Sequence, residues 1–148
     1  MTGVSLDTSG NAYVSGEFGS GLVLGPLTVT TSDYVVEYTA AGNVGWAIQD
    51  PPDGELGIHG LALGTSLYTF GNGDLGNEPD GGTSMSLDGL DLATGKLVTS
   101  APCSATMGIG QTVTASSAGV FVAGQGGPPG QFGKHFLTQT GLFVAKTK

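Results

Sequence analysis

The chain has 148 residues, of which 28 are glycine, about 19% against a usual share of about 7%. Only 11% of the residues are charged, and 12 acidic residues against four lysines give a formal net charge of −8. A protein that follows nucleic-acid phosphates needs clustered lysine and arginine, so this composition excludes nucleic acid as a partner. No apolar run approaches the roughly 18 residues of a membrane-spanning helix, which excludes a membrane span of that kind.

Strand-like segments follow one another along the whole chain. Short runs of β-branched and aromatic residues are bounded by Gly, Asn, Asp, Ser and Pro, and no window of ten residues free of Gly and Pro shows helical apolar spacing. In chain order, we expect strands at Gly3–Leu6, Ala12–Phe18, Tyr34–Tyr38, Val44–Ile48, Gly60–Leu63, Leu67–Gly71, Ser86–Leu92, Leu97–Ser100, Thr112–Ala115, Val120–Gly124 and Leu142–Lys146. The prediction is an all-β fold of antiparallel hairpins.

Three of these hairpins share one pattern. Each is a short strand, a turn, and a second strand in which an aromatic residue stands three positions before a glycine. The aromatic–glycine pairs are Tyr13 and Gly16, Tyr68 and Gly71, and Phe121 and Gly124, so the glycines are 55 and 53 residues apart. The turns that contain Gly42 and Gly95 repeat the 53-residue offset. Two landmarks with one spacing indicate an internal repeat.

A period near 50 residues with about four strands per unit is typical of a β-propeller blade. Blades fan outward from an axis, so inner strands need small residues and outer strands need bulky ones such as Trp46. We therefore predict a single β-propeller segment of about three blades, built of four-stranded antiparallel sheets. Blade one covers residues 1–57, blade two covers 58–110, and blade three, which is incomplete, covers 111–148.

Two stretches of the first unit carry the motifs of a known repeat. They read Asp7-Thr-Ser-Gly10-Asn11-Ala-Tyr13-Val-Ser-Gly16, and Asp33-Tyr-Val-Val-Glu-Tyr38 followed by Gly42-Asn43-Val-Gly-Trp46. These motifs resemble the bacterial β-propeller repeat of the SBBP type, and Leu142–Lys146 is similar to the third strand of that repeat. The resemblance implies a scaffold of secreted and surface-attached bacterial proteins, without shared catalytic residues.

Closed propellers have about four to eight blades, so three blades leave two blade faces and a strand edge uncovered. The function we expect is a non-catalytic structural or protein-interaction module that further chain, or another copy, completes into a ring or sheet. The partners are then other protein chains or copies of itself, and the chain is not expected to be an enzyme. The expected location is extracellular or at the cell surface, although the chain shows no signal peptide.

Two acidic loops are the candidates for a metal site. Their carboxylates stand two to four residues apart among Gly and Pro, as oxygen ligands of Ca²⁺ do, yet neither loop has the spacing of an EF-hand. Acidic residues also suit solvated turns, and on that interpretation no cofactor is bound. The candidate calcium ligands are Asp50, Asp53, Glu55, Asp74, Glu78 and Asp80.

The alternative function is a carbohydrate-binding, lectin-like propeller module. Trp46, Tyr34 and Tyr38 are the candidates for a platform on which a sugar ring stacks. The competing interpretation places these aromatic side chains in packing between neighbouring blades.

Overall fold

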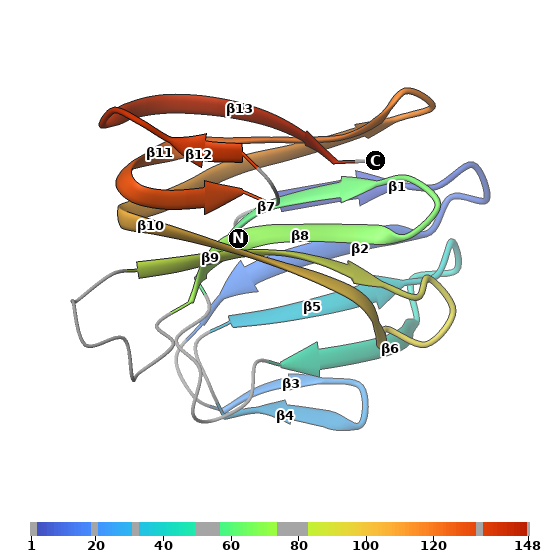
Figure 1. Cartoon of the computed structure of the whole chain (residues 1–148). Helices are drawn as coiled ribbons and strands as arrows, with labels where there is room; N and C mark the ends of the chain where they lie inside the picture. Colours follow the sequence, from blue (N-terminus) through green and yellow to red (C-terminus); the bar gives the residue numbers. More distant parts are fainter. Residues whose placement is uncertain are drawn as a thin grey trace.

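The computed structural model describes residues 3–18, 21–30, 33–49, 57–73, 83–132 and 135–147. All regular structure in these ranges is β-strand, in antiparallel sheets of which none closes on itself (Figure 1). The predicted all-β fold class is therefore confirmed. Within the same ranges there is no helix of the length and apolar character needed to cross a membrane.

The first sheet has four strands in the order β1-β2-β5-β6, and each neighbouring pair is antiparallel. Their bounds are β1 Gly3–Leu6, β2 Ala12–Glu17, β5 Asp33–Tyr38 and β6 Val44–Gln49. These are the four strands that the sequence predicts within residues 1–57, with ends that differ by at most one residue.

A small hairpin separates β2 from β5 in the chain. It consists of β3 (Leu22–Leu24) and β4 (Leu27–Val29) and forms a two-stranded sheet of its own. Leu24 and Val29 are buried against Val36 of β5, so the hairpin covers part of one face of the first sheet. The sequence does not predict these strands, because three residues are too few to show an alternating pattern.

A second sheet of seven strands contains the remaining elements. Its order is β12-β11-β10-β9-β8-β7, and β13 pairs with β11. The bounds are β7 Gly57–Leu63, β8 Leu67–Gly73, β9 Thr83–Leu90, β10 Leu97–Ser116, β11 Gly119–Phe132, β12 His135–Leu137 and β13 Gly141–Thr147.

Strand β10 differs most from the sequence prediction. The sequence predicts two short strands, Leu97–Ser100 and Thr112–Ala115, on either side of a blade boundary after residue 110. Instead, one strand of 20 residues pairs with β9 through residues 97–105 and with β11 through residues 103–116. Register shifts interrupt its pairing with β11 at three places, where the strand can bend without leaving the sheet. Strands β7 to β13 therefore share one hydrogen-bonded sheet rather than two separate ones.

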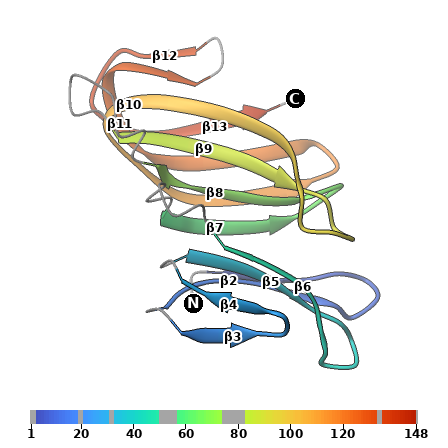
Figure 2. The ribbon, with the colours of Figure 1, turned by 90° about the horizontal axis from the view of Figure 1, so that it is seen from below.

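The seven-stranded sheet curls over itself, and the first sheet packs beside it (Figure 2). Inside the curl, Phe70 and Met85 pack with Val122 from the opposite half of the sheet. Between the two sheets, Trp46 of the first sheet packs with Leu67 and Leu90 of the second. These contacts make the interface between the two sheets a second apolar core.

Strands β1, β7 and β10 lie side by side, β1 in the first sheet and both β7 and β10 in the second. A Cβ added to Gly3 of β1 would lie 2.8 Å from Cβ of Leu61 in β7, and one added to Gly60 of β7 would lie 2.8 Å from the amide nitrogen of Val113 in β10. Glycine is required at both positions because the neighbouring strand comes this close. The first strands of the three predicted hairpins are thus neighbours in space.

Candidate functional site

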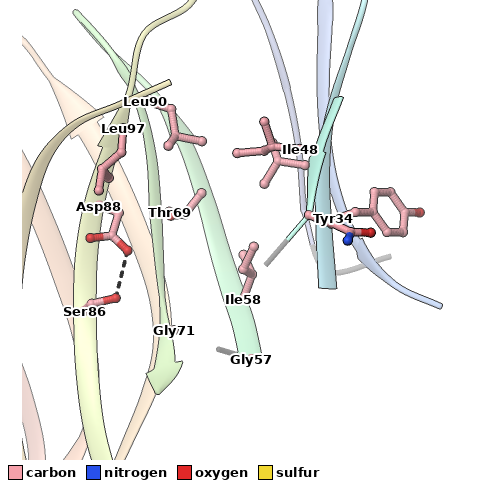
Figure 3. A pocket seen from close by; sticks show the side chains of 12 residues that line it. Tyr34, Ile48, Gly57, Ile58, Thr69, Gly71, Ser86, Asp88, Leu90 and Leu97 are labelled. Atoms are coloured by element: carbon pink, nitrogen blue, oxygen red, sulfur yellow. Dashed lines mark hydrogen bonds between the residues drawn. The ribbon is translucent and has the colours of Figure 1, made fainter. Parts of the chain in front are cut away.

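A cleft of about 260 Å³ lies between the first sheet and the seven-stranded sheet, and we call it the inter-sheet cleft (Figure 3). One wall comes from β5 and β6, and the other comes from β7, β8, β9 and the start of β10. The lining residues are Tyr34, Val35, Ile48, Gln49, Gly57, Ile58, Thr69, Gly71, Ser86, Asp88, Leu90 and Leu97.

The glycines of the three hairpins have different neighbours across the ladder. In the first sheet the ring of Tyr34 lies over its cross-strand partner Gly16, and at the other end of the molecule the ring of Phe143 lies over its partner Gly124. The corresponding glycine of the middle hairpin, Gly71, pairs with Ser86, which has no ring. The place of a side chain at Gly71 is filled by the backbone of Gly57 and Ile58 in β7, and the cleft lies beside Ser86.

Most of the cleft surface is apolar. Ile48 projects from β6 toward Ile58 of β7 and Leu90 of β9, as the side chains in Figure 3 show. Leu97 is at the rim, with 60% of its surface exposed. Such a surface favours a ligand with an apolar body, because burying apolar area releases about 25 cal/mol per Å².

The polar residues of the cleft include one with a carboxylate, Asp88 on β9. The hydroxyl of Ser86 donates a hydrogen bond of 2.9 Å to Oδ2 of Asp88. Oδ1 of the same carboxylate is buried and accepts no hydrogen bond in the described part of the chain. Thr69, which is 7% exposed, stands directly across from Asp88 on β8. An unpartnered buried oxygen is rare in folded proteins and requires an explanation, such as a water or an ion.

A second polar cluster is built from the β1–β2 turn. The carboxylate of Asp7 accepts hydrogen bonds from the backbone N–H groups of Ser9 and Asn11 and from the side-chain amide of Asn11, at 2.8, 2.8 and 2.9 Å. Desolvation raises the pKa of Asp7, but these hydrogen bonds together outweigh it and hold that pKa below its usual value. This cluster stabilises a turn and offers no unsatisfied group of Asp7 to a ligand.

Glu37 lies near this turn, in the middle of β5. Its side chain is only 9% exposed, and it stands across from Tyr13 of β2. Desolvation, followed by the nearby charge of Asp7, raises the pKa of Glu37. The two carboxyl groups therefore have pKa values that are moved in opposite directions.

The three aromatic residues proposed for sugar stacking do not form one platform. The ring of Trp46 is 8% exposed and packs between the sheets, where its N–H donates a hydrogen bond of 2.9 Å to the carbonyl of Leu92. Tyr34 and Tyr38 lie on the opposite face of the first sheet, together with Val36. Figure 3 shows the ring of Tyr34 directed away from the cleft.

The candidate calcium ligands Asp50, Asp53, Glu55, Asp74, Glu78 and Asp80 all lie outside the described residues. Within the described residues, no three side chains of His, Cys, Asp or Glu come together as a metal site would require.

Sequence reasoning missed Ser86 and Asp88 as site residues. The signal was present in β9, where Met85 and Leu87 alternate with Ser86 and Asp88. A polar face on a strand that packs against another sheet marks a place where something other than an apolar side chain is accommodated. Comparison of the chain with protein-family models, with curated proteins and with solved structures finds no match.

Proposed function

We propose that the protein is a non-catalytic structural or protein-interaction module, a propeller-like stack of sheets that further copies of the chain complete. The observation that carries the proposal is apolar exposure at both ends of the stack. Val4 and Leu6 on β1 are 57% and 68% exposed, and Leu142 and Val144 on β13 are 86% and 76% exposed. We call these two surfaces the terminal faces.

The repeated hairpins support the proposal that a sheet of one copy of the chain packs on a sheet of another copy. Tyr13, Tyr68 and Phe121 all stand near the start of the second strand of a hairpin, and each pairs with a residue of the first strand: Ser5, Ala62 and Thr114. Because the three hairpins are built alike, the surface by which one hairpin packs on the next is also present on the last hairpin. The terminal faces of two copies are therefore suited to each other.

The edge of β13 supports the same proposal. Among the described strands, β13 pairs with β11 alone, whereas its counterpart β5 in the first sheet also pairs with β6. An edge strand with exposed apolar side chains is a template for another strand. The resemblance to the bacterial β-propeller repeat adds an extracellular or cell-surface location to the proposal.

The test is the mass of the 148-residue chain in solution, measured by light scattering over a concentration series. We expect the wild type to form a defined oligomer and the double variant Leu142→Ser, Val144→Ser to be a monomer, because the substitutions remove apolar area from one terminal face. The double variant Val98→Ser, Ile109→Ser serves as the matched control, since these residues are 53% and 42% exposed but lie on β10. A wild-type chain that stays monomeric at every concentration, or a control variant that dissociates equally, overturns the proposal.

A further inference from the structure

We infer that the free edge of β13 binds an extended acidic segment of a partner chain, which adds to the sheet as one more strand. The inference rests on the proposed function, because it names what a partner supplies at one end of the stack. It combines three observations: a repeated strand register, an edge without a partner strand, and the charge of Lys146.

The strands of the chain form three comparable units, each of which begins with one of the repeated hairpins. Unit one is β1-β2-β5-β6, and unit two is β7-β8-β9 with residues 97–105 of β10. Unit three is the second part of β10 with β11 and β13. Units one and two therefore have four strands, and unit three has three.

Units one and two place their fourth strand against the third strand in the same register. In unit one, Val35 of β5 pairs with Ile48 of β6. In unit two, Leu87 of β9 pairs with Ala101 of β10. Val35 and Leu87 each come directly after the residue that pairs with the hairpin glycine. The position of a fourth strand is thus defined twice within the chain.

The two fourth strands also share an irregularity. Gly45 of β6 and Val98 of β10 are extra residues that the pairing skips. The skip falls between the third and fourth residues after Tyr34 in unit one and after Ser86 in unit two. A bulge bends a strand locally, so a fourth strand of the same shape is used in both units.

Unit three offers the same edge without its strand. Phe143 of β13 pairs with the hairpin glycine Gly124, so Val144 stands at the position of Val35 and Leu87. Val35 and Leu87 are 2% and 5% exposed, whereas Val144 is 76% exposed. Among the described strands β13 pairs with β11 alone, and it lies at the outer edge of its sheet (Figure 1). An edge of this kind leaves backbone N–H and C=O groups open to another strand.

The charge at this edge selects the partner. Lys146 is the one ionisable side chain of β13; it is exposed, and its Nζ lies 5.7 Å from the ring centre of Phe121. All 12 acidic residues of the chain lie within residues 1–91, and its four lysines lie within residues 96–148. Opposite charges directly across a ladder attract and like charges repel, so an acidic residue is favoured across from Lys146.

The partner is therefore a strand-forming segment with a defined pattern. Main-chain hydrogen bonds to β13 supply affinity, and alternate side chains supply specificity. Ile48 and Ala101 predict an apolar residue across from Val144. Two positions away along the segment, an acidic residue lies across from Lys146, at the place that Trp46 has in unit one.

The experiment is a titration of labelled peptides with the full chain, followed by fluorescence anisotropy. The first peptide has the sequence of residues 43–49 with Trp46→Glu, which keeps the extra glycine and the apolar residue. The second peptide has Trp46→Lys instead. The third is the first peptide with methylated backbone amides at positions 47 and 48, so that it lacks a donor on either of its edges. We expect saturable binding of the first peptide, binding at least about twofold weaker for the second, and binding at least about tenfold weaker for the third.

Two variants of the protein locate the site. Lys146→Glu is expected to reverse the preference, so that the peptide with lysine binds more tightly than the peptide with glutamate. Lys96→Glu is the matched control, because it makes the same change of net charge at an exposed position in the turn between β9 and β10 and is expected to keep the wild-type preference. The circular dichroism spectrum of each variant verifies that it is folded.

Three results would overturn the inference: no saturable binding of the first peptide up to about 1 mM, equal affinity for the methylated peptide, or an equal effect of Lys146→Glu and Lys96→Glu. Light scattering on the same samples separates this outcome from failure of the proposed function. An oligomer that neither binds the first peptide nor loses mass in its presence overturns strand addition alone, whereas a chain that is monomeric without peptide overturns assembly from copies.

Discussion

Asp88 and Glu37 both direct a carboxyl group toward a largely apolar interface. Each carboxyl group has a cost in folding free energy, and the physical cause of that cost differs between the two. For Asp88 the cost is an oxygen without a hydrogen-bond donor. For Glu37 it is desolvation together with the neighbouring charge of Asp7, both of which disfavour the ionised form. The cost of burying Glu37 depends on pH, because it is the ionised form that is disfavoured. It can therefore be measured as a change of the free energy of unfolding with pH.

Glu37→Gln is expected to raise the free energy of unfolding at pH 7. The folded-state pKa of Glu37 lies above its ordinary value of 4.5, so the folded protein holds this proton more tightly than the unfolded chain does. The wild type therefore loses stability as the pH rises from 4.5 through the folded-state pKa, and glutamine removes that loss. Urea unfolding at pH 7 and pH 4 measures the difference between variant and wild type, which should be largest at pH 7 and smallest at pH 4.

Glu17→Gln controls for the removal of a carboxylate, since Glu17 is exposed on β2. Its free energy of unfolding should stay within about 0.5 kcal/mol of the wild type at both pH values. A stabilisation by Glu37→Gln that is the same at pH 4 and pH 7 would contradict the assignment of the effect to ionisation.

The contacts of a side chain with residues close to it in the sequence were predictable. The contacts of a side chain across the interface between the two sheets were not. The turn begun by Asp7 follows from Asp, Gly and Asn at fixed positions, and Gly10 has the φ of +86° that such a turn requires. Trp46 was open to two interpretations, because its partner Leu92 is 46 residues away. Asp88 was missed for the same reason: its burial depends on how the first sheet packs against the second.

Two turns with the same glycine pattern join strands at corresponding places. Gly42 lies in the turn between β5 and β6 with φ +81°, and Gly95 lies in the turn between β9 and β10 with φ +69°. Both turns close with a backbone hydrogen bond of 2.8 Å, from Thr39 N–H to Asn43 and from Asp91 N–H to Lys96. Their surroundings differ, since a Cβ on Gly95 would lie 2.5 Å from the ring of Trp46 and one on Gly42 would meet nothing within 4 Å.

Gly95→Ala is therefore expected to destabilise the protein more than Gly42→Ala. Both substitutions place an L side chain in the left-handed region, which costs about 1–2 kcal/mol. Gly95→Ala also forces the ring of Trp46 to move, and overpacking of this kind adds about 1–3 kcal/mol. Urea unfolding gives the two free energies, and Gly42→Ala is the matched control. Equal costs would show that the β9–β10 turn does not pack against Trp46.

The strands themselves were more predictable than the way they join. Alternating apolar residues located β2, β8 and β13 to within two residues, because that pattern is local. The continuity of β10 through residues 101–111 was not predictable, because it depends on two different partner strands, β9 on one side and β11 on the other. The register shifts that allow this are responses to packing and leave no fixed sequence signal.

The first sheet and the seven-stranded sheet depend on each other for burial. Leu67 on β8 is fully buried, and it lies in the same cluster as Tyr13 and Trp46 of the first sheet. The Tyr13 and Trp46 rings are 6.1 Å apart, at a tilt of 43° that is usual for aromatic pairs. Separation of the two sheets would expose this whole cluster, so we expect them to unfold together.

Unfolding in urea should accordingly give one transition, whether it is followed by tryptophan fluorescence or by far-ultraviolet circular dichroism. Trp46 is the only tryptophan of the chain, and because it lies in the interface its fluorescence reports the separation of the sheets. Circular dichroism reports the strands of both sheets, so coincident curves indicate two-state behaviour. Leu67→Ala should lower the free energy of unfolding by about 2–5 kcal/mol, the usual cost of a cavity in a core, and should shift both curves equally. If the fluorescence transition instead preceded the circular dichroism transition, the first sheet would separate from a seven-stranded sheet that remains folded, and the interface would join two independent units.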